Sequence, residues 1–421
     1  MVYARLCYDA PMPPNKNDTA AREFRSALRW SPDSDKFRLL AGVLLVLFAL
    51  YALVFGGLTV KRLQAGQLGD FFALWSTARL AIEGQPAEVY DPAALKAFQL
   101  GLGMDEGQSY PFPYPPSFLL ALLPLGLLPL GVAYVVFIGG TLALYLWATA
   151  GGRWRTWMTL AALLAPTTTI TAVAGQAGFV AAALLIGGFR LAPARPVVAG
   201  MLFGLATYKP QLGILVPVAL VAAGWWRTII AAGVTGVVLA VVTGLAFGRG
   251  IWEAWIAHII EYAHQFAVES GAIEHLMPTV AAGMAQLGAP PLLIEISQAA
   301  AAVVAVVVVW LCFRYGPVPL AAAALFVATF LASPHSFVYD MPPVATAVLW
   351  TIAERHRAGD AFGTGEILVL LLATVSPITL VAGSTVLPLS QLSLALLLGV
   401  IAHRCLRRHS AVAFGPARRE V

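Results

Sequence analysis

The stretch LLAGVLLVLFALYALVFGGLTV, residues 39–60, decides the class of fold. It contains no charged residue and is long enough for one helix to cross a bilayer, which takes about 20 apolar residues. The whole chain has the same character, because 59% of its 421 residues are hydrophobic and only 11% are charged. Soluble domains carry about 25% charged residues. Together with a mean hydropathy of +0.80, this composition predicts a polytopic membrane protein.

Further apolar runs predict an all-α bundle of about twelve transmembrane helices, residues 39–405, between a polar cytoplasmic segment 1–38 and a basic cytoplasmic tail 406–421. The segment SFLLALLPLGLL, residues 117–128, is short and bracketed by prolines, which predicts a half-helix or re-entrant piece. The other runs after the first are 131–150, 157–174, 177–190, 197–207, 211–225, 228–247, 291–312, 318–332, 342–353, 367–383 and 387–402.

The basic residues sort to alternate loops, as topology signals do. With the N-terminus in the cytoplasm, the loops that fall inside hold Arg153/Arg155, Arg190/Arg195, Arg227, Arg314, Arg355/Arg357 and Arg404/Arg407/Arg408. The net charge of +5 therefore does not indicate a nucleic-acid partner. The three cysteines, Cys7, Cys312 and Cys405, are far apart and follow no disulfide or metal-ligand spacing.

Two long loops, 61–116 and 248–290, fall on the outer side, and both carry amphipathic patterns that predict helices lying in the membrane interface. In the first loop the segment GQLGDFFALW, residues 66–75, puts the carboxylate of Asp70 where the chain has just left the membrane. Two interpretations of Asp70 stand together. It can cap the helix that begins there, and it can keep its second oxygen free for chemistry. The apolar face of that helix would be Phe71, Leu74, Trp75, Ala78 and Ile82.

The segment ATYKPQLGIL, residues 206–215, places Lys209 and Gln211 around Pro210, between two apolar runs. A lysine at membrane depth costs about 2.5–3.5 kcal/mol. Proline breaks a helix, and broken helices with polar residues line cavities instead of lipid. The sequence therefore favours a functional lysine over one that only snorkels from a helix end.

The segment ASPHSFVYDMPP, residues 332–343, gathers polar side chains in an otherwise apolar region: Ser333, His335, Ser336, Tyr339 and Asp340. A capped turn between helices is the simpler interpretation, but histidine with tyrosine and aspartate favours a functional role. Gln176, in VAGQAGF, lies between two glycines and is interpreted as part of a structural turn. The segment YPFPYPP, residues 110–116, predicts a rigid extended connector whose tyrosines belong to an aromatic belt.

HExxH, Walker A, and GxGxxG in a strand–helix context are absent from the sequence, and the two long outer loops contain no DxD motif. The sequence thus gives no ground for a soluble nucleotide-sugar or ATP site. It also lacks an acidic cluster suited to Mg²⁺, so neither a metal nor a cofactor is predicted.

The order of these features resembles the GT-C membrane glycosyltransferases, in particular glycosyltransferase family 87, which includes polyprenol-phosphate-mannose-dependent alpha-mannosyltransferases. The resemblance rests on GDFFALWSTARLAIEGQPAEVYDP, YPFPYPPSFLLALLPLGLLPL, GQAGFVAAALL, AGMLFGLATYKPQLGILVP and SPHSFVYDMPP, which together extend over residues 40–355. It implies a GT-C-like bundle in the inner (plasma) membrane with its active site facing the periplasm or exterior. It implies an inverting transfer of a sugar from a polyprenyl-phosphate donor to a lipid or glycan acceptor. Mannose, arabinofuranose and other hexoses remain open.

The resemblance also assigns roles to residues. Asp70 would be the general base, and the donor phosphate would be held by Lys209, His335 and Arg79. Other contacts with the substrates would come from Gln176, Gln211, Tyr339 and Asp340. These roles agree with elementary chemistry, because displacement needs a carboxylate to take the acceptor proton and cations to hold the leaving phosphate.

Two other functions are weighed against this one. A transporter or flippase of a lipid-linked substrate would suit broken helices and a lysine within the membrane. The sequence shows no inverted repeat, however, and its buried charges lie toward the outer side. A non-catalytic scaffold would explain the hydrophobicity but not Lys209 or the SPHSFVYD segment.

Overall fold

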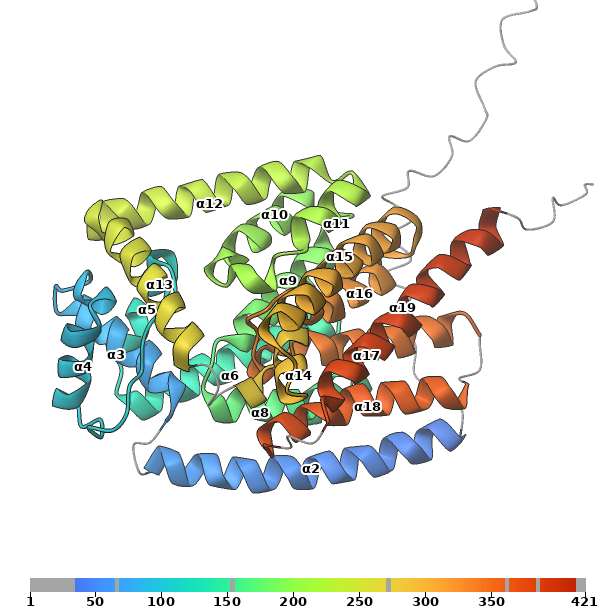
Figure 1. Cartoon of the computed structure of the whole chain (residues 1–421), viewed down its shortest axis with the longest axis horizontal. Helices are drawn as coiled ribbons and strands as arrows, with labels where there is room; N and C mark the ends of the chain where they lie inside the picture. Colours follow the sequence, from blue (N-terminus) through green and yellow to red (C-terminus); the bar gives the residue numbers. More distant parts are fainter. Residues whose placement is uncertain are drawn as a thin grey trace, which may run out of the picture.

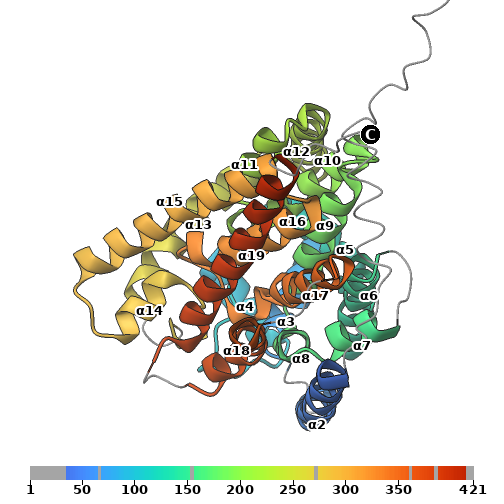
Figure 2. The ribbon, with the colours of Figure 1, turned by 90° about the vertical axis from the view of Figure 1, so that its right-hand side faces the viewer.

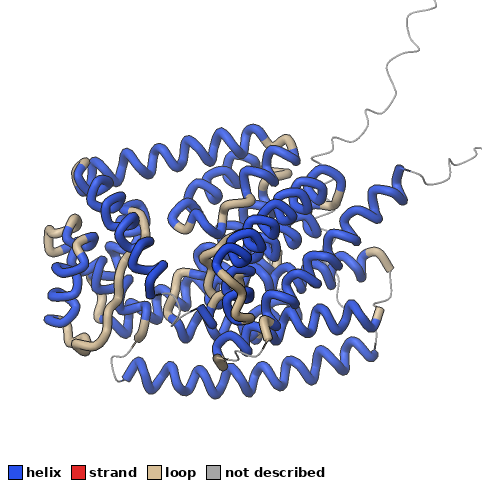
Figure 3. The backbone as a smooth tube through the Cα atoms, viewed as in Figure 1, coloured by secondary structure: helices blue, strands red, loops and turns tan. Residues whose placement is uncertain are grey.

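The computed structural model describes residues 35–64, 68–151, 156–269, 274–359, 363–383 and 387–413. These residues form helices and loops with no β-strand among them (Figure 3), which confirms the predicted all-α class. The predicted N-terminal cytoplasmic segment lies almost wholly outside the described residues. The last helix continues to Ala413, into the segment predicted as the C-terminal tail.

Six helices of the described chain are long and apolar enough to cross a membrane. They are α2 (Asp35–Gln64), α6 (Leu130–Thr149), α12 (Trp226–Phe247), α15 (Pro291–Tyr315), α18 (Thr364–Val381) and α19 (Leu389–Ala413). Protein covers very little of two of them: 6% of the apolar window is buried in α2 and in α12, and Leu245 of α12 is 81% exposed. Apolar helices of this length with uncovered faces require lipid around them, so the protein is membrane-embedded.

The predicted count of about twelve crossings is not confirmed. The run 157–174, predicted as one span, is broken into α7 (Thr156–Leu164) and α8 (Pro166–Ala174), which meet at 53°. Pro166 explains the break, because proline cannot donate the hydrogen bond that would continue α7. Counting this bent pair as one span raises the number from six to seven.

Several predicted runs form helices shorter than a full span. They are α5 (Pro116–Gly126), α9 (Gly178–Leu191), α10 (Pro196–Leu205), α11 (Val216–Ala223), α16 (Val318–Ala332) and α17 (Pro342–Arg357). The short helix predicted for 117–128 is confirmed as α5. The run 211–225 yields only α11, because the chain first passes through the irregular segment around Pro210.

Most residues of α9, α16 and α17 are buried, so these helices form the centre of the bundle. The helices α2 and α12 lie on opposite outer sides (Figure 2). Every residue of α16 from Pro319 to Ala332 is buried. A run of small residues, Ala321–Ala324, lets neighbouring helices approach closely, as small residues do in membrane bundles.

One end of the bundle carries a cluster of charged residues. Glu366, in the first turn of α18, contacts both Arg355 of α17 and Arg404 of α19, and the bond to Arg355 measures 2.5 Å. Two arginine groups that the sequence assigns to the same side of the membrane therefore meet at one end of the structure.

The opposite end holds a helical unit formed mainly by the first long loop (Figure 1). It contains α3 (Asp70–Ile82), η1 (Glu88–Tyr90), α4 (Pro92–Gly101) and the start of α5. The second long loop supplies α13 (Gly250–Glu269), η5 (Glu274–Leu276) and α14 (Val280–Gln286), and α13 packs against this unit.

The prediction that α3 is an amphipathic interfacial helix is wrong. Most of the helix is buried on all sides, including Ser76 of the expected polar face, and only the residues at its end, Arg79 and Glu83, keep part of that face exposed. Contacts with α4, α5 and α6 surround the helix. Its first residue is therefore held in a fixed position by protein and not by the membrane surface.

Candidate active site

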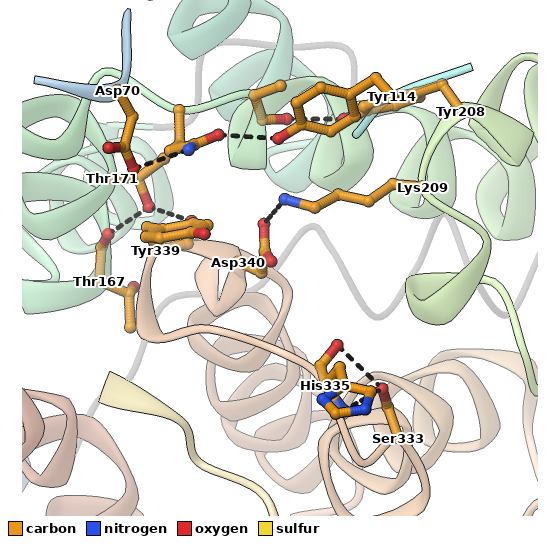
Figure 4. A network of polar contacts seen from close by, with 12 residues as sticks. Asp70, Tyr114, Thr167, Thr171, Tyr208, Lys209, Ser333, His335, Tyr339 and Asp340 are labelled. Atoms are coloured by element: carbon orange, nitrogen blue, oxygen red, sulfur yellow. Dashed lines mark hydrogen bonds and ion pairs between the residues drawn. The ribbon is translucent and has the colours of Figure 1, made fainter. Parts of the chain in front are cut away.

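Five segments that are distant in sequence converge around Asp70 and Lys209 (Figure 4). They are the start of α3, the connector 110–116, the turn between α8 and α9, the break between η2 (Ala206–Tyr208) and η3 (Pro210–Leu212), and η6 (Val338–Asp340). The sequence places each of them on the outer side, and the structure brings them together.

Asp70 is the first residue of α3 and does not cap it. The cap position is occupied by Gly69, which has φ 54°, and the helix start has no side-chain cap. The capping interpretation is therefore wrong. Instead, Gln176 Nε2 donates a hydrogen bond of 2.7 Å to Asp70 Oδ2. The Asp70 side chain is half-buried, so part of it remains accessible.

The turn between α8 and α9 carries Gln176 and fits closely between two neighbouring segments, α3 and η6. Gly175 ends α8 with φ 71°, and a Cβ there would lie 2.6 Å from the Cβ of Phe71. Gly178 begins α9, and a Cβ there would overlap the carbonyl oxygen of Tyr339. Glycine has no Cβ and tolerates positive φ, so these two residues let the turn fit between α3 and η6.

Replacing Gly178 by alanine (Gly178→Ala) is expected to destabilise the protein by about 1–3 kcal/mol, the usual cost of overpacking. The added methyl group must displace the Tyr339 backbone. Thermal unfolding in detergent measures the effect. The matched control is Gly139→Ala, in α6, where a Cβ meets nothing within 4 Å. Equal melting temperatures for the two variants would contradict the close approach.

Tyr114, which the sequence pattern places in an aromatic belt, belongs to the site. Its hydroxyl donates to Gln176 Oε1 at 2.8 Å, and its backbone carbonyl accepts a bond of 3.0 Å from the hydroxyl of Tyr90. Burial raises the pKa of Tyr114 to about 12, so the hydroxyl keeps its proton at neutral pH. The signal in the sequence was a tyrosine between two prolines, Pro113 and Pro115, which restrict the backbone.

Lys209 and Asp340 form a buried ion pair. Lys209 Nζ lies 2.5 Å from Asp340 Oδ1, and the side chains are 4% and 0% exposed. The ammonium group also lies 5.1 Å from the ring centre of Tyr339 and 5.7 Å from that of Tyr114, distances suited to cation–π attraction. Asp340 Oδ2 has no hydrogen-bond partner among the described residues.

Opposing influences set the charge state of Asp70. Burial raises the pKa of its carboxyl group, while the hydrogen bond from Gln176 and the positive charge of Lys209 lower it. The net result is a pKa above the ordinary range for aspartate. A carboxylate with a raised pKa is a stronger base, so this setting suits proton transfer.

The other predicted site residues lie differently. Tyr339 is held by its carbonyl, which accepts a bond of 2.7 Å from Thr171. His335 is exposed, in a turn made with Ser333, and Figure 4 shows both apart from Asp70. Gln211 is half-buried in η3, without a contact to Asp70 or Lys209 among the hydrogen bonds of the described chain.

Arg79 lies at the far end of α3 from Asp70. Nine residues along a helix span about 13 Å. Its Nε is 3.5 Å from Glu83 Oε1, and both side chains are about half exposed. The guanidinium also lies 5.7 Å from the ring centre of Trp75. The structure thus brings together Asp70, Gln176, Lys209, Tyr339 and Asp340, and it separates Arg79 from them.

An apolar cavity of about 630 Å³ adjoins the break at Lys209. Its walls come from α9, α10, α11, α12 and the two short helices around Lys209. Ala206, Thr207 and Pro210, on either side of Lys209 in sequence, line one end, and Gly236 of α12 lines another part. A cavity with such walls suits a hydrocarbon chain.

A protein-family model described as glycosyltransferase family 87 matches residues 112–334, just over half of the chain. The matched region includes Tyr114, Gln176 and Lys209. Neither the curated proteins nor the solved structures include a significant match.

Proposed function

The chain belongs to glycosyltransferase family 87, and on that premise we propose that it transfers a sugar from a polyprenyl-phosphate donor to a hydroxyl group of a lipid or glycan acceptor. The observation that carries the proposal is the Asp70 carboxylate, half-buried, with one oxygen bound to Gln176 and a raised pKa. It lies within electrostatic reach of the buried Lys209, whose sequence neighbours Thr207 and Pro210 line an apolar cavity.

The proposed reaction is a direct displacement at the sugar. The acceptor oxygen forms a bond to the anomeric carbon, and the bond from that carbon to the phosphate oxygen breaks. Its electron pair leaves with the polyprenyl phosphate, and the acceptor proton passes to Asp70. Attack from the face opposite the phosphate inverts the anomeric centre. Asp70 then releases the proton to water.

Lys209 is the proposed cation for the leaving phosphate, whose negative charge grows as the bond breaks. The ammonium group has three N–H donors, and Asp340 is bonded to one of them. His335 is a second proposed phosphate contact, from an exposed turn. The position of Arg79 at the far end of α3 does not support the same role for it.

The proposed orientation places this site on the outer face of the membrane. The arginine cluster at Glu366 lies at the end of the bundle opposite α3 and α4 (Figure 1). Arginine-rich loops are retained on the cytoplasmic side, which supports an outward-facing Asp70.

The donor class is tested with purified protein and a panel of polyprenyl-phosphate sugars, with native lipid extract as acceptor. The proposal expects a new glycolipid or glycan product with one donor of the panel. A protein that moves labelled lipid across a vesicle membrane but yields no product with any donor would instead be a transporter.

The apolar cavity is proposed to hold the first part of the polyprenyl chain. Replacing Gly236 by phenylalanine (Gly236→Phe) fills space in which a Cβ meets nothing within 4 Å. Displacing two or three methylene groups, at about 0.8 kcal/mol each, is expected to raise KM for a long-chain donor roughly tenfold or more. A donor with a single isoprenoid unit should be affected far less. Gly140→Phe in α6, also in open space, is the control. An equal effect on both donors would refute this assignment.

A further inference from the structure

The hydrogen bonds of Asp70 leave its two carboxylate oxygens in different situations. Oδ2 accepts the bond of 2.7 Å from Gln176. For Oδ1 no hydrogen-bond partner occurs in the part of the chain that the structure describes. One oxygen is therefore anchored, and the other is available to a ligand.

A hydrogen bond to the oxygen of the Gln176 amide fixes the orientation of that amide. Tyr114 donates to Gln176 Oε1 at 2.8 Å. A buried phenol that keeps its proton is a dependable donor. Because Oε1 is occupied by this bond, the NH₂ group of Gln176 must face Asp70. If the amide turned over, its oxygen would face a carboxylate oxygen, which is repulsive.

We propose that Gln176 and Tyr114 are positioning residues for the transfer reaction: Tyr114 orients the Gln176 amide, and Gln176 holds Asp70 Oδ2 so that Oδ1 faces the acceptor hydroxyl. This inference rests on the proposed function. It changes the role expected for Gln176 from contact with a substrate to alignment of the base, and it adds Tyr114, for which the sequence predicts no chemical role.

The backbone around both residues is consistent with a fixed alignment. Gly175 and Gly178 bring the Gln176 turn into contact with Phe71 on one side and Tyr339 on the other. The carbonyl of Tyr114 is bound by Tyr90. The amide and the phenol are thus carried by rigid segments, as precise positioning requires.

The pKa of Asp70 depends on the groups around it, so the pH dependence of activity reports whether the bond from Gln176 is present. Lys209 is the cation that lowers the pKa of Asp70, and the bond from Gln176 lowers it further. The neighbouring phenols have raised pKa values and stay neutral at the acid side of the profile: Tyr110, Tyr114, Tyr262 and Tyr339. Loss of the Gln176 bond should therefore raise the pKa of Asp70. As the pH is lowered, activity should then begin to fall at a higher pH than in wild type.

The experiment measures kcat and kcat/KM for transfer against pH in Gln176→Ala, Tyr114→Phe and the double variant. Gln176→Ala is expected to lower kcat at least about tenfold, as one hydrogen bond to a charged group can, and to move the acid limb to higher pH. Tyr114→Phe, which keeps the ring, should move the limb the same way by less. The double variant should match Gln176→Ala, because Tyr114 acts through Gln176.

The matched control is Gln99→Ala. Gln99 is a buried glutamine of α4, and it bonds to Ser76 Oγ at 3.0 Å and to the carbonyl of Tyr110 at 2.9 Å, away from Asp70. The acid limb of the Gln99→Ala profile should stay in place. Thermal unfolding measures any loss of stability in Gln99→Ala and in Gln176→Ala. An unmoved limb in Gln176→Ala would overturn the proposal, and additive shifts in the double variant would overturn the part assigned to Tyr114. Failure of wild-type protein to transfer any sugar would instead overturn the proposed function.

Discussion

Replacing Asp70 by asparagine (Asp70→Asn) is expected to lower the rate of sugar transfer about 100- to 10,000-fold, the range over which a positioned general base accelerates a reaction. Asparagine has nearly the same shape and can still accept the bond from Gln176, but it cannot take a proton. The variant should fold normally, because burial disfavours the charge of Asp70 and the substitution removes that charge. Single-turnover measurements with saturating donor would isolate the chemical step.

A second aspartate of the same outer unit provides the control. Asp91 caps α4 by accepting bonds of 2.8 and 3.1 Å from the backbone N–H groups of Ala93 and Ala94. Asparagine is as good a cap, so Asp91→Asn removes one negative charge without removing a base. Its transfer rate should stay close to that of wild type. Equal rates for Asp70→Asn and Asp91→Asn would remove Asp70 from the chemistry.

The ion pair of Lys209 and Asp340 is expected to give the second large effect. Removing either partner alone, as Lys209→Met or Asp340→Asn, leaves an uncompensated buried charge and should destabilise the protein by about 3–5 kcal/mol. Both side chains are nearly inaccessible, so solvent cannot screen the remaining charge. Each single variant should melt at a clearly lower temperature in detergent and lose transfer.

The double variant separates structure from chemistry at this pair. With both charges removed, Lys209→Met/Asp340→Asn should recover much of the lost stability, because neutral replacements of buried pairs are often tolerated. Transfer should not recover, because the cation proposed to hold the leaving phosphate is missing. Recovery of both stability and transfer would show that Lys209 is only structural.

The helical class of the fold was predictable from composition and hydropathy, and the details of its spans were not. Most apolar runs correspond to helices, since an apolar run long enough to cross a membrane has few alternatives to a helix. Hydropathy does not register a bend, however, so the run 157–174 gave no sign of the 53° angle between α7 and α8 apart from Pro166. The burial of α3 was also missed, because packing against α4 and α5 is a tertiary property.

The candidate site, too, was predictable from the sequence only in part. Asp70 and Lys209 stood out because a charge in an apolar setting is costly and calls for an explanation. Gln176 looked structural because its flanking glycines indicate a turn. The structure adds that these glycines serve close approach to Phe71 and Tyr339. Tyr114 could not be distinguished from an interfacial tyrosine by sequence alone, since its role depends on a hydrogen bond to a residue 62 positions away.

The separation of Arg79 from the site follows from helix geometry. A straight helix keeps residues nine positions apart about 13 Å from each other, so Arg79 and Asp70 lie at opposite ends of α3. The pairing of Lys209 with Asp340 is likewise a tertiary contact, across 131 positions of sequence.

The most direct test of the central claim measures two products in one reaction. Purified wild-type protein and Asp70→Asn are each incubated with the polyprenyl-phosphate sugar that serves as donor and with acceptor lipid. The sugar transferred and the polyprenyl phosphate released are then both quantified. The account predicts equal amounts of the two products from wild type and neither from Asp70→Asn. Equal product formation by both proteins, or donor left unconsumed by folded wild type across the whole panel, would contradict it.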